Sequence, residues 1–118
     1  MSVSDFHQPD PAVVQAERRL HPRYNVKVQI ELRADGSDIP MRLETTDLSR
    51  SGCYIVMTMP LPVSTEVDAT LWLGEQRIRV RGRIVTRHPQ FGNGIMFLKF
   101  EGDDEKTLCT FLDHVKAD

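Results

Sequence analysis

Apolar and polar residues alternate along most of the chain with a period of two, which is typical of β-strands that bury one face. The first such run covers residues 24–33, where the apolar positions are Val26, Val28, Ile30 and Leu32. Turn residues delimit further runs, which predict strands over 39–47, 52–57, 66–73, 76–88 and 94–101. The last run is continuously apolar through its middle, so we expect it to be buried on both faces.

The period changes after Gly102. Apolar residues then recur at spacings of three and four, as on one buried face of a helix: Leu108, Phe111, Leu112 and Val115. Acidic residues at 103–105 occupy the expected first turn, where negative charge is favourable. Six short strands joined by short turns and followed by a helix predict a mainly β fold, a six-stranded antiparallel β-barrel with a C-terminal α-helix.

The N-terminal part of the chain shows no sustained period. Residues 1–16 contain prolines at 9 and 11 and scattered polar residues, so we expect a flexible leader. The barrel domain is then expected over 17–118, beginning with a flexible arginine-rich arm. A chain of 118 residues is long enough for one domain with its own core.

Four arginines share one face of the fifth predicted strand: Arg77, Arg79, Arg81 and Arg83. A two-residue turn at Gly74 and Glu75 fixes how this strand pairs with the preceding one. The resulting partners are Trp72 with Arg77, Asp68 with Arg81, Glu66 with Arg83, and Leu71 with Ile78. Because this register places opposite charges outside and apolar residues inside, we interpret the row as a cross-strand ion-pair ladder rather than a phosphate track.

Composition and charge narrow the function classes. The net charge of −2 argues against a dedicated nucleic-acid binder, so any anion site has to be local. The apolar surroundings of Cys53 and Cys109 indicate reduced core residues. No apolar stretch approaches the roughly 20 residues that span a bilayer, so we expect no membrane insertion and a cytoplasmic location.

The sequence offers no catalytic or metal-binding constellation. The four histidines share no metal-ligand spacing with one another or with a cysteine. There is no nucleophile elbow and no glycine-rich phosphate loop ahead of a helix. We therefore expect a protein that is not an enzyme and that uses no metal or cofactor. Four methionines in or beside strands are expected to fill gaps in the core: Met41, Met57, Met59 and Met96.

Two polar segments fit neither the ladder nor the core. Arg18, Arg19 and Arg23 precede the first strand with only Glu17 as an acidic neighbour, and Pro22 keeps this piece from being helical. The second segment, residues 47–52, has the sequence DLSRSG. Its Asp47 and Ser49 offer hydrogen-bonding side chains, and Gly52 permits a positive φ or a close approach by a ligand.

Together these segments resemble the two motifs of the PilZ family of bacterial cyclic di-GMP receptors. One motif is RxxxR, here Arg19 to Arg23, and the other is D/NxSxxG, here Asp47 to Gly52. Both occur in the expected order on the expected succession of strands. The resemblance extends to the fold, because this family is also expected to form a six-stranded antiparallel barrel with a C-terminal helix. It therefore covers the chain except for residues 1–16.

The resemblance implies that the ligand is cyclic di-GMP. Arginine suits this ligand because its planar fork binds both a phosphate and the O6/N7 edge of guanine. We expect Arg19 and Arg23 to bind phosphate and the guanine edge, and Asp47 and Ser49 to bind polar groups of a guanine. Gly52 is expected to let the turn approach the ligand closely. An arm closing on a rigid barrel would act as a clamp.

Arg18 directly precedes the arginine motif. The resemblance to the PilZ family implies that the residue at this position influences whether one ligand or a stacked pair binds. A second cyclic di-GMP adds two phosphate charges that another cation has to offset, so Arg18 favours two ligands per chain. The alternative is that Arg18 pairs with Glu17 or stays solvated.

The output of such a protein is expected to pass to another protein. No catalytic or DNA-reading domain accompanies the barrel, which favours a stand-alone receptor or adaptor that changes conformation and signals to an unidentified effector protein. The alternative is a PilZ-like protein-protein interaction module that binds no nucleotide. A barrel for single-stranded nucleic acid is disfavoured because Trp72 stands nearly alone among the basic residues.

Overall fold

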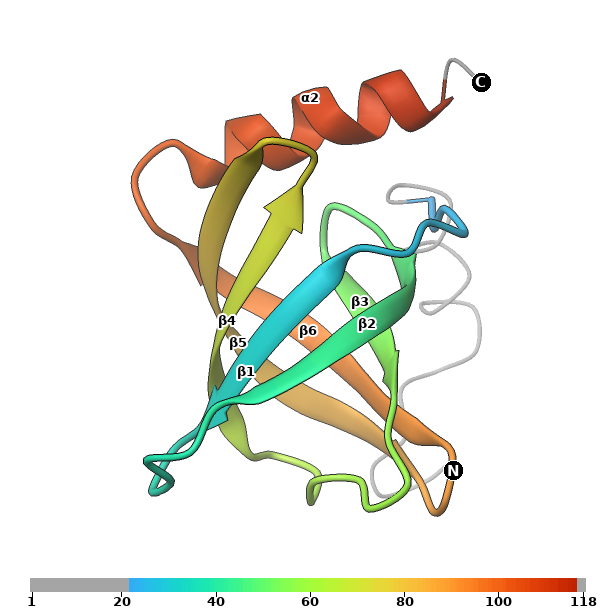
Figure 1. The fold of residues 1–118 in the computed structure, drawn as a ribbon, viewed down its shortest axis with the longest axis vertical. Coiled ribbons are helices and arrows are strands. Elements are labelled where there is room, and N and C mark those ends of the chain that lie inside the picture. The colour runs from blue at the N-terminus through green and yellow to red at the C-terminus, as the bar shows by residue number, and fades with distance from the viewer. Residues whose placement is uncertain (1–21, 117–118) are drawn as a thin grey trace, which may run out of the picture.

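Six antiparallel strands close into a barrel, and a helix lies across one of its ends (Figure 1). This computed structural model describes residues 22–116. The elements are β1 (Gln29–Ala34), β2 (Met41–Leu48), β3 (Gly52–Val56), β4 (Glu66–Leu73), β5 (Gln76–His88), β6 (Gly92–Phe100) and α2 (Asp104–Lys116). Their order around the barrel is β1-β2-β3-β6-β5-β4, with β4 pairing back to β1. The predicted fold class is therefore confirmed.

Alternation along the strands builds the core. Every second side chain points into the barrel, and the most deeply buried include Ile30, Leu32, Ile55, Leu71 and Ile78. The helix closes the barrel end with the two buried members of its apolar stripe, Leu108 and Leu112. Its first turn is fixed by Asp104, whose carboxylate accepts a hydrogen bond of 2.8 Å from the amide of Arg79. The β4–β5 hairpin reaches α2 in Figure 1.

The predicted β4–β5 register is confirmed at every pair. Trp72 lies opposite Arg77, Asp68 opposite Arg81, Glu66 opposite Arg83, and Leu71 opposite Ile78. Gly74 has a φ of 65°, which is the left-handed conformation that the two-residue turn requires of its first central residue. Both strands have the predicted bounds.

The first strand is shorter than the alternation predicts. Residues 24–28 extend along the barrel but form only an isolated bridge, between Tyr24 and Leu48. The buried hydroxyl of Thr45 pairs with this piece: it donates to the Val26 carbonyl at 2.9 Å and accepts from the Val28 amide at 3.0 Å. A side chain thus replaces part of the strand ladder here.

The expectation that the last strand is buried on both faces is wrong. Met96 and Leu98 in β6 are 39% and 40% exposed, because the outer face of the barrel is uncovered at β6 while Ile95 and Phe97 point inward. The interpretation of the methionines as core residues fails for the same reason at Met96, and also at Met59, which is 83% exposed in the β3–β4 connection. Met41 and Met57 do pack against the core.

Candidate functional site

The segment that precedes β1 pairs with the end of β2. The amide of Tyr24 donates to the carbonyl of Leu48 at 2.9 Å, and the amide of Leu48 donates back to Tyr24 at 3.0 Å. This reciprocal pair fixes the segment to the barrel at Tyr24. The arginine-rich arm is therefore joined to β2 at its C-terminal end. Figure 1 shows this segment and the β2–β3 turn at the barrel end that carries α2.

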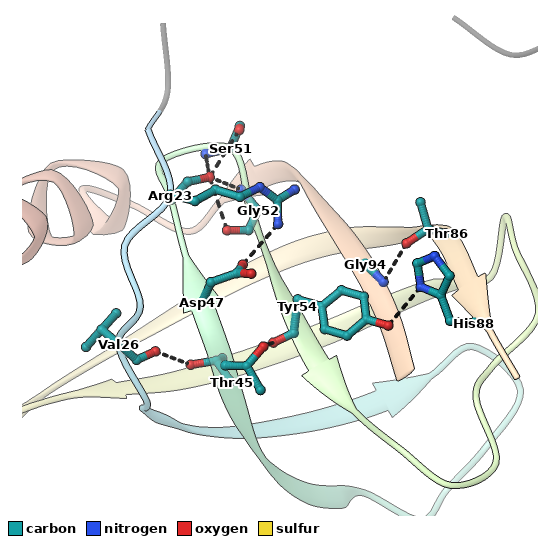
Figure 2. Close-up of polar contacts among 12 residues, drawn as sticks. Arg23, Val26, Thr45, Asp47, Ser51, Gly52, Tyr54, Thr86, His88 and Gly94 are labelled. Atoms are coloured by element: carbon teal, nitrogen blue, oxygen red, sulfur yellow. Dashed lines mark hydrogen bonds and ion pairs between the residues drawn. The ribbon is translucent and has the colours of Figure 1, made fainter. Parts of the chain in front are cut away.

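The Tyr24–Leu48 pair brings together one residue from each sequence motif. Nη1 of Arg23 lies 3.0 Å from Oδ1 of Asp47 and donates a hydrogen bond to it (Figure 2). Their side chains remain 48% and 24% exposed, respectively. Among residues 22–116, the other donors of the Arg23 guanidinium and the second carboxylate oxygen of Asp47 form no side-chain hydrogen bond. They suit a phosphate and a guanine edge, respectively.

Ser49 organises the β2–β3 turn from inside. It is buried, and its hydroxyl accepts hydrogen bonds from the amides of Ser51 and Gly52, both at 3.1 Å. The same hydroxyl is 3.2 Å from the Gly52 carbonyl and 3.3 Å from the Ser51 hydroxyl. This is a serine turn, in which a side chain takes the place of a backbone partner. The geometry gives Ser49 a role in shaping the turn that the sequence analysis did not anticipate.

Gly52 is required by the neighbouring strand. A Cβ at this position would lie 2.1 Å from the carbonyl oxygen of Ile95 in β6, so any side chain would collide with backbone. Its φ is not among the positive values of the described glycines, which rules out the positive-φ explanation. The amide of Phe97 also donates to the Ser51 carbonyl at 2.8 Å. The turn is thereby held tightly against β6.

The negative charge of Asp47 affects two neighbours on β3. Tyr54 lies opposite Asp47 in the β2–β3 register, and its pKa is raised by partial burial and by that charge. Burial, reinforced by Asp47, raises the pKa of the Cys53 thiol to about 12. Cys53 is accordingly a protonated core residue, as expected, whereas Cys109 is only half-buried.

The outer face beyond Asp47 carries a polar pair that the motifs did not indicate. The hydroxyl of Tyr54 is 2.8 Å from Nδ1 of His88, across β6 on β5 (Figure 2). The Tyr54 ring passes over Gly92, where a Cβ would come within 3.0 Å of the ring. The alternation of β3 places Tyr54 outward beside Asp47, so the position of Tyr54 could have been predicted from the sequence. Its contact with His88 could not, because it depends on the pairing of β3 with β6 and of β6 with β5.

Two of the predicted site residues fall outside the described part of the chain. These are Arg18 and Arg19, together with the leader at 1–16. The structure brings the other four together at the end of β2 and the start of β3: Arg23, Asp47, Ser49 and Gly52. Within residues 22–116, no group of three or more His, Cys, Asp or Glu side chains is arranged to hold a metal ion. Over the same residues, no helix is both long and apolar enough to cross a membrane.

Comparison with known proteins agrees with the fold and the motifs. A family model described as the PilZ domain matches residues 17–114. The structure of the Bacillus subtilis inhibitor of motility, MotI/DgrA, is similar with a TM-score of 0.71 and 12% identity, over 85% of this chain and 52% of that one. This chain thus spans about half the length of MotI. The PilZ domain of CeSA from a cellulose-synthesizing bacterium is similar with a TM-score of 0.63 and 19% identity, over 80% of this chain and 97% of that one. At these identities the two structures show a shared fold. A sequence search among curated proteins gave no match.

Proposed function

The chain belongs to the PilZ domain family, and on that premise we propose that it is a cyclic di-GMP receptor that signals to a partner protein. The observation that carries the proposal is the meeting of the two motifs at the Arg23–Asp47 pair. Residues 24 positions apart form one exposed polar site at the end of the barrel. The ligand has the phosphates and guanine edges that these two groups suit.

Each residue of the site has its own part in this proposal. Arg23 binds phosphate or the guanine edge with its free donors, and Asp47 accepts hydrogen bonds from the guanine. Ser49 and Gly52 act as positioning residues: one fixes the turn by its hydroxyl, and the other lets β3 pack on β6. Arg19 supplies the second motif arginine.

Binding has to compete with the existing Arg23–Asp47 pair. An exposed ion pair of this kind contributes about 0–1 kcal/mol, whereas a charge-assisted hydrogen bond to a ligand contributes about 1.5–3 kcal/mol. A phosphate can therefore recruit Arg23 at small cost. Fixing further arm residues costs about 1–2 kcal/mol each, which offsets much of the gain from the ligand contacts. The ligand-free and ligand-bound conformations therefore differ little in free energy, and the arm acts as a switch.

The alternative function is an interaction module without nucleotide. It is supported by the same pair, because Arg23 and Asp47 already form an ion pair without a ligand. In either function the chain is an adaptor and not an enzyme. The expected cytoplasmic location and the absence of a cofactor stay predictions.

Isothermal titration of the full chain distinguishes the candidates. We expect saturable binding of cyclic di-GMP and no measurable binding of GMP or of a short DNA oligonucleotide. Absence of cyclic di-GMP binding would leave the interaction module, and tighter binding of the oligonucleotide would indicate a single-stranded nucleic-acid barrel.

A further inference from the structure

The row of four arginines on β5 consists of two halves with different surroundings. The row is Arg77, Arg79, Arg81 and Arg83. Arg81 is hydrogen-bonded to Asp35 at 2.8 Å and to Asp68 at 3.2 Å, and Arg83 is bonded to Glu66 at 2.9 Å. This half is the ion-pair ladder that the sequence predicts. The other half, Arg77 and Arg79, lies opposite the uncharged residues Trp72 and Thr70, respectively. In residues 22–116, no ion pair includes either of these two arginines.

The second half of the row faces a pocket of about 330 Å³ on the outside of the barrel. The pocket is lined by Glu31, Arg42, Thr70, Trp72, Arg77 and Arg79, which come from β1, β2, β4 and β5. None of its lining residues belongs to the motif site at the end of β2. The guanidinium of Arg42 lies over the Trp72 ring at 5.0 Å from its centroid, in cation–π geometry.

Two nearby carboxylates are already engaged by other arginines, and a third, that of Asp104, accepts a hydrogen bond from the Arg79 amide. Glu31, inside the pocket, is 3.2 Å from Arg42. Asp68, at its border, is 3.2 Å from Arg81 and 3.9 Å from Arg33. Three guanidinia against one carboxylate leave a local positive charge on a chain whose net charge is −2. The exposed side chains of Arg77 and Arg79 are the cations of this pocket that an anionic partner can bind.

The composition of the pocket favours a protein partner over a nucleic acid. Tryptophan and arginine are among the residues most enriched in the strong contacts of protein interfaces. A nucleic-acid track needs several exposed aromatic rings for stacking, whereas Trp72 is the single tryptophan of the chain and one of its faces is covered by Arg42. The barrel is closed and offers no free strand edge here, so a partner has to be bound by side chains.

We propose that the pocket around Trp72, Arg77 and Arg79 is a docking site for an acidic segment of a partner protein. Arg77 and Arg79 point to the same face of β5 and are two residues apart, a separation of about 6.6–6.8 Å. Carboxylates at alternate positions of an extended peptide have the same spacing, so one such segment pairs with both guanidinia. This inference does not depend on nucleotide binding.

Trp72 makes the proposal directly measurable, because its emission reports contact at the pocket itself. The full chain is titrated with a ten-residue peptide of alternating glutamate and alanine, at low and at physiological salt. We expect a saturable change in Trp72 emission that weakens as salt rises, since screening shortens the reach of surface charges. The R77Q/R79Q variant should bind at least tenfold more weakly, with an unchanged melting temperature.

Two controls keep the test specific. The R87Q/K106Q variant removes the same number of positive charges from exposed residues that do not line the pocket, and we expect its affinity to stay within twofold of wild type. A peptide of alternating glutamine and alanine should leave the emission unchanged. The proposal is overturned if the glutamate peptide causes no saturable change, if both double variants lose affinity equally, or if a ten-nucleotide thymidine oligomer binds more tightly than the peptide.

Discussion

Arg23 and Asp47 are 24 positions apart in the sequence, yet their side chains meet at 3.0 Å. The contact forms because Tyr24 and Leu48, the residues that follow them, exchange two backbone hydrogen bonds. One residue of each motif is therefore positioned by main-chain pairing, while the side chains of Arg23 and Asp47 stay accessible. The backbone pairing and the proposed ligand-binding side chains are thus separate parts of the candidate site.

Replacing Ser49 by alanine is expected to destabilise the protein by about 1–3 kcal/mol, because the amides of Ser51 and Gly52 would lose a buried acceptor. Urea unfolding measures this as a lower midpoint. Ser51→Ala, at an exposed position in the same turn, serves as the control and should change the midpoint little. Equal midpoints for Ser49→Ala and wild type would show that the turn does not need the hydroxyl.

Gly52→Ala is expected to cost about 1–3 kcal/mol of stability through overpacking, because its Cβ would meet the backbone carbonyl of Ile95. Thermal unfolding of the variant tests this. Cyclic di-GMP affinity should fall as well, since the turn that follows Asp47 would be displaced from β6. A variant that melts with the wild type would contradict the close approach of β3 and β6.

The free energy of unfolding is expected to fall in acid because ion pairs of the Arg81 cluster are lost. This cluster consists of Arg81, Arg83, Asp35 and Glu66. Hydrogen bonding from Arg81 lowers the pKa of Asp35, and hydrogen bonding from Arg83 lowers the pKa of Glu66. Carboxyls with a lowered folded pKa stabilise the protein above their ordinary values of about 4, and this contribution is lost as the pH falls through the folded pKa. Urea unfolding between pH 6 and pH 3 should show a smaller decline in Arg81→Gln. Parallel curves for the variant and wild type would remove the cluster from the acid response.

The ligand count depends on Arg18 in our account. We expect two cyclic di-GMP molecules per chain, and Arg18→Leu should lower the count toward one while first-site affinity stays within about tenfold, because only the second ligand requires the extra cation. Calorimetric stoichiometry provides the measurement. One ligand per wild-type chain, or an unaltered count in the variant, would exclude Arg18 from the site.

Local patterns predicted some parts of this molecule and not others. The β4–β5 register followed from the sequence because a two-residue turn and matching charges fix it within one hairpin. The bonds of Arg81 to Asp35 did not, because Asp35 reaches the row only through the β1–β4 closure of the barrel. The exposure of Leu98 was missed because an apolar run does not reveal which face of a barrel stays uncovered.

The candidate site divides in the same way. Its residue types follow from two short motifs, and the resemblance that these carry predicts which residues form the site. The inward position of Ser49 does not follow from the motif, since a serine beside an aspartate fits a ligand contact as well as a turn. The burial of Ser49 and the bonds of its hydroxyl to the amides of Ser51 and Gly52 distinguish the two roles.

The central claim is that cyclic di-GMP binds through Asp47 and Arg23, and titration calorimetry of Asp47→Ala against wild type and Ser51→Ala tests it most directly. Asp47 lies in an exposed pair that contributes about 0–1 kcal/mol to folding, so the variant should remain folded. We predict that Asp47→Ala binds at least about 100-fold more weakly, a loss of about 2.8 kcal/mol, while Ser51→Ala stays close to wild type. Wild-type affinity in a folded Asp47→Ala protein would contradict the account.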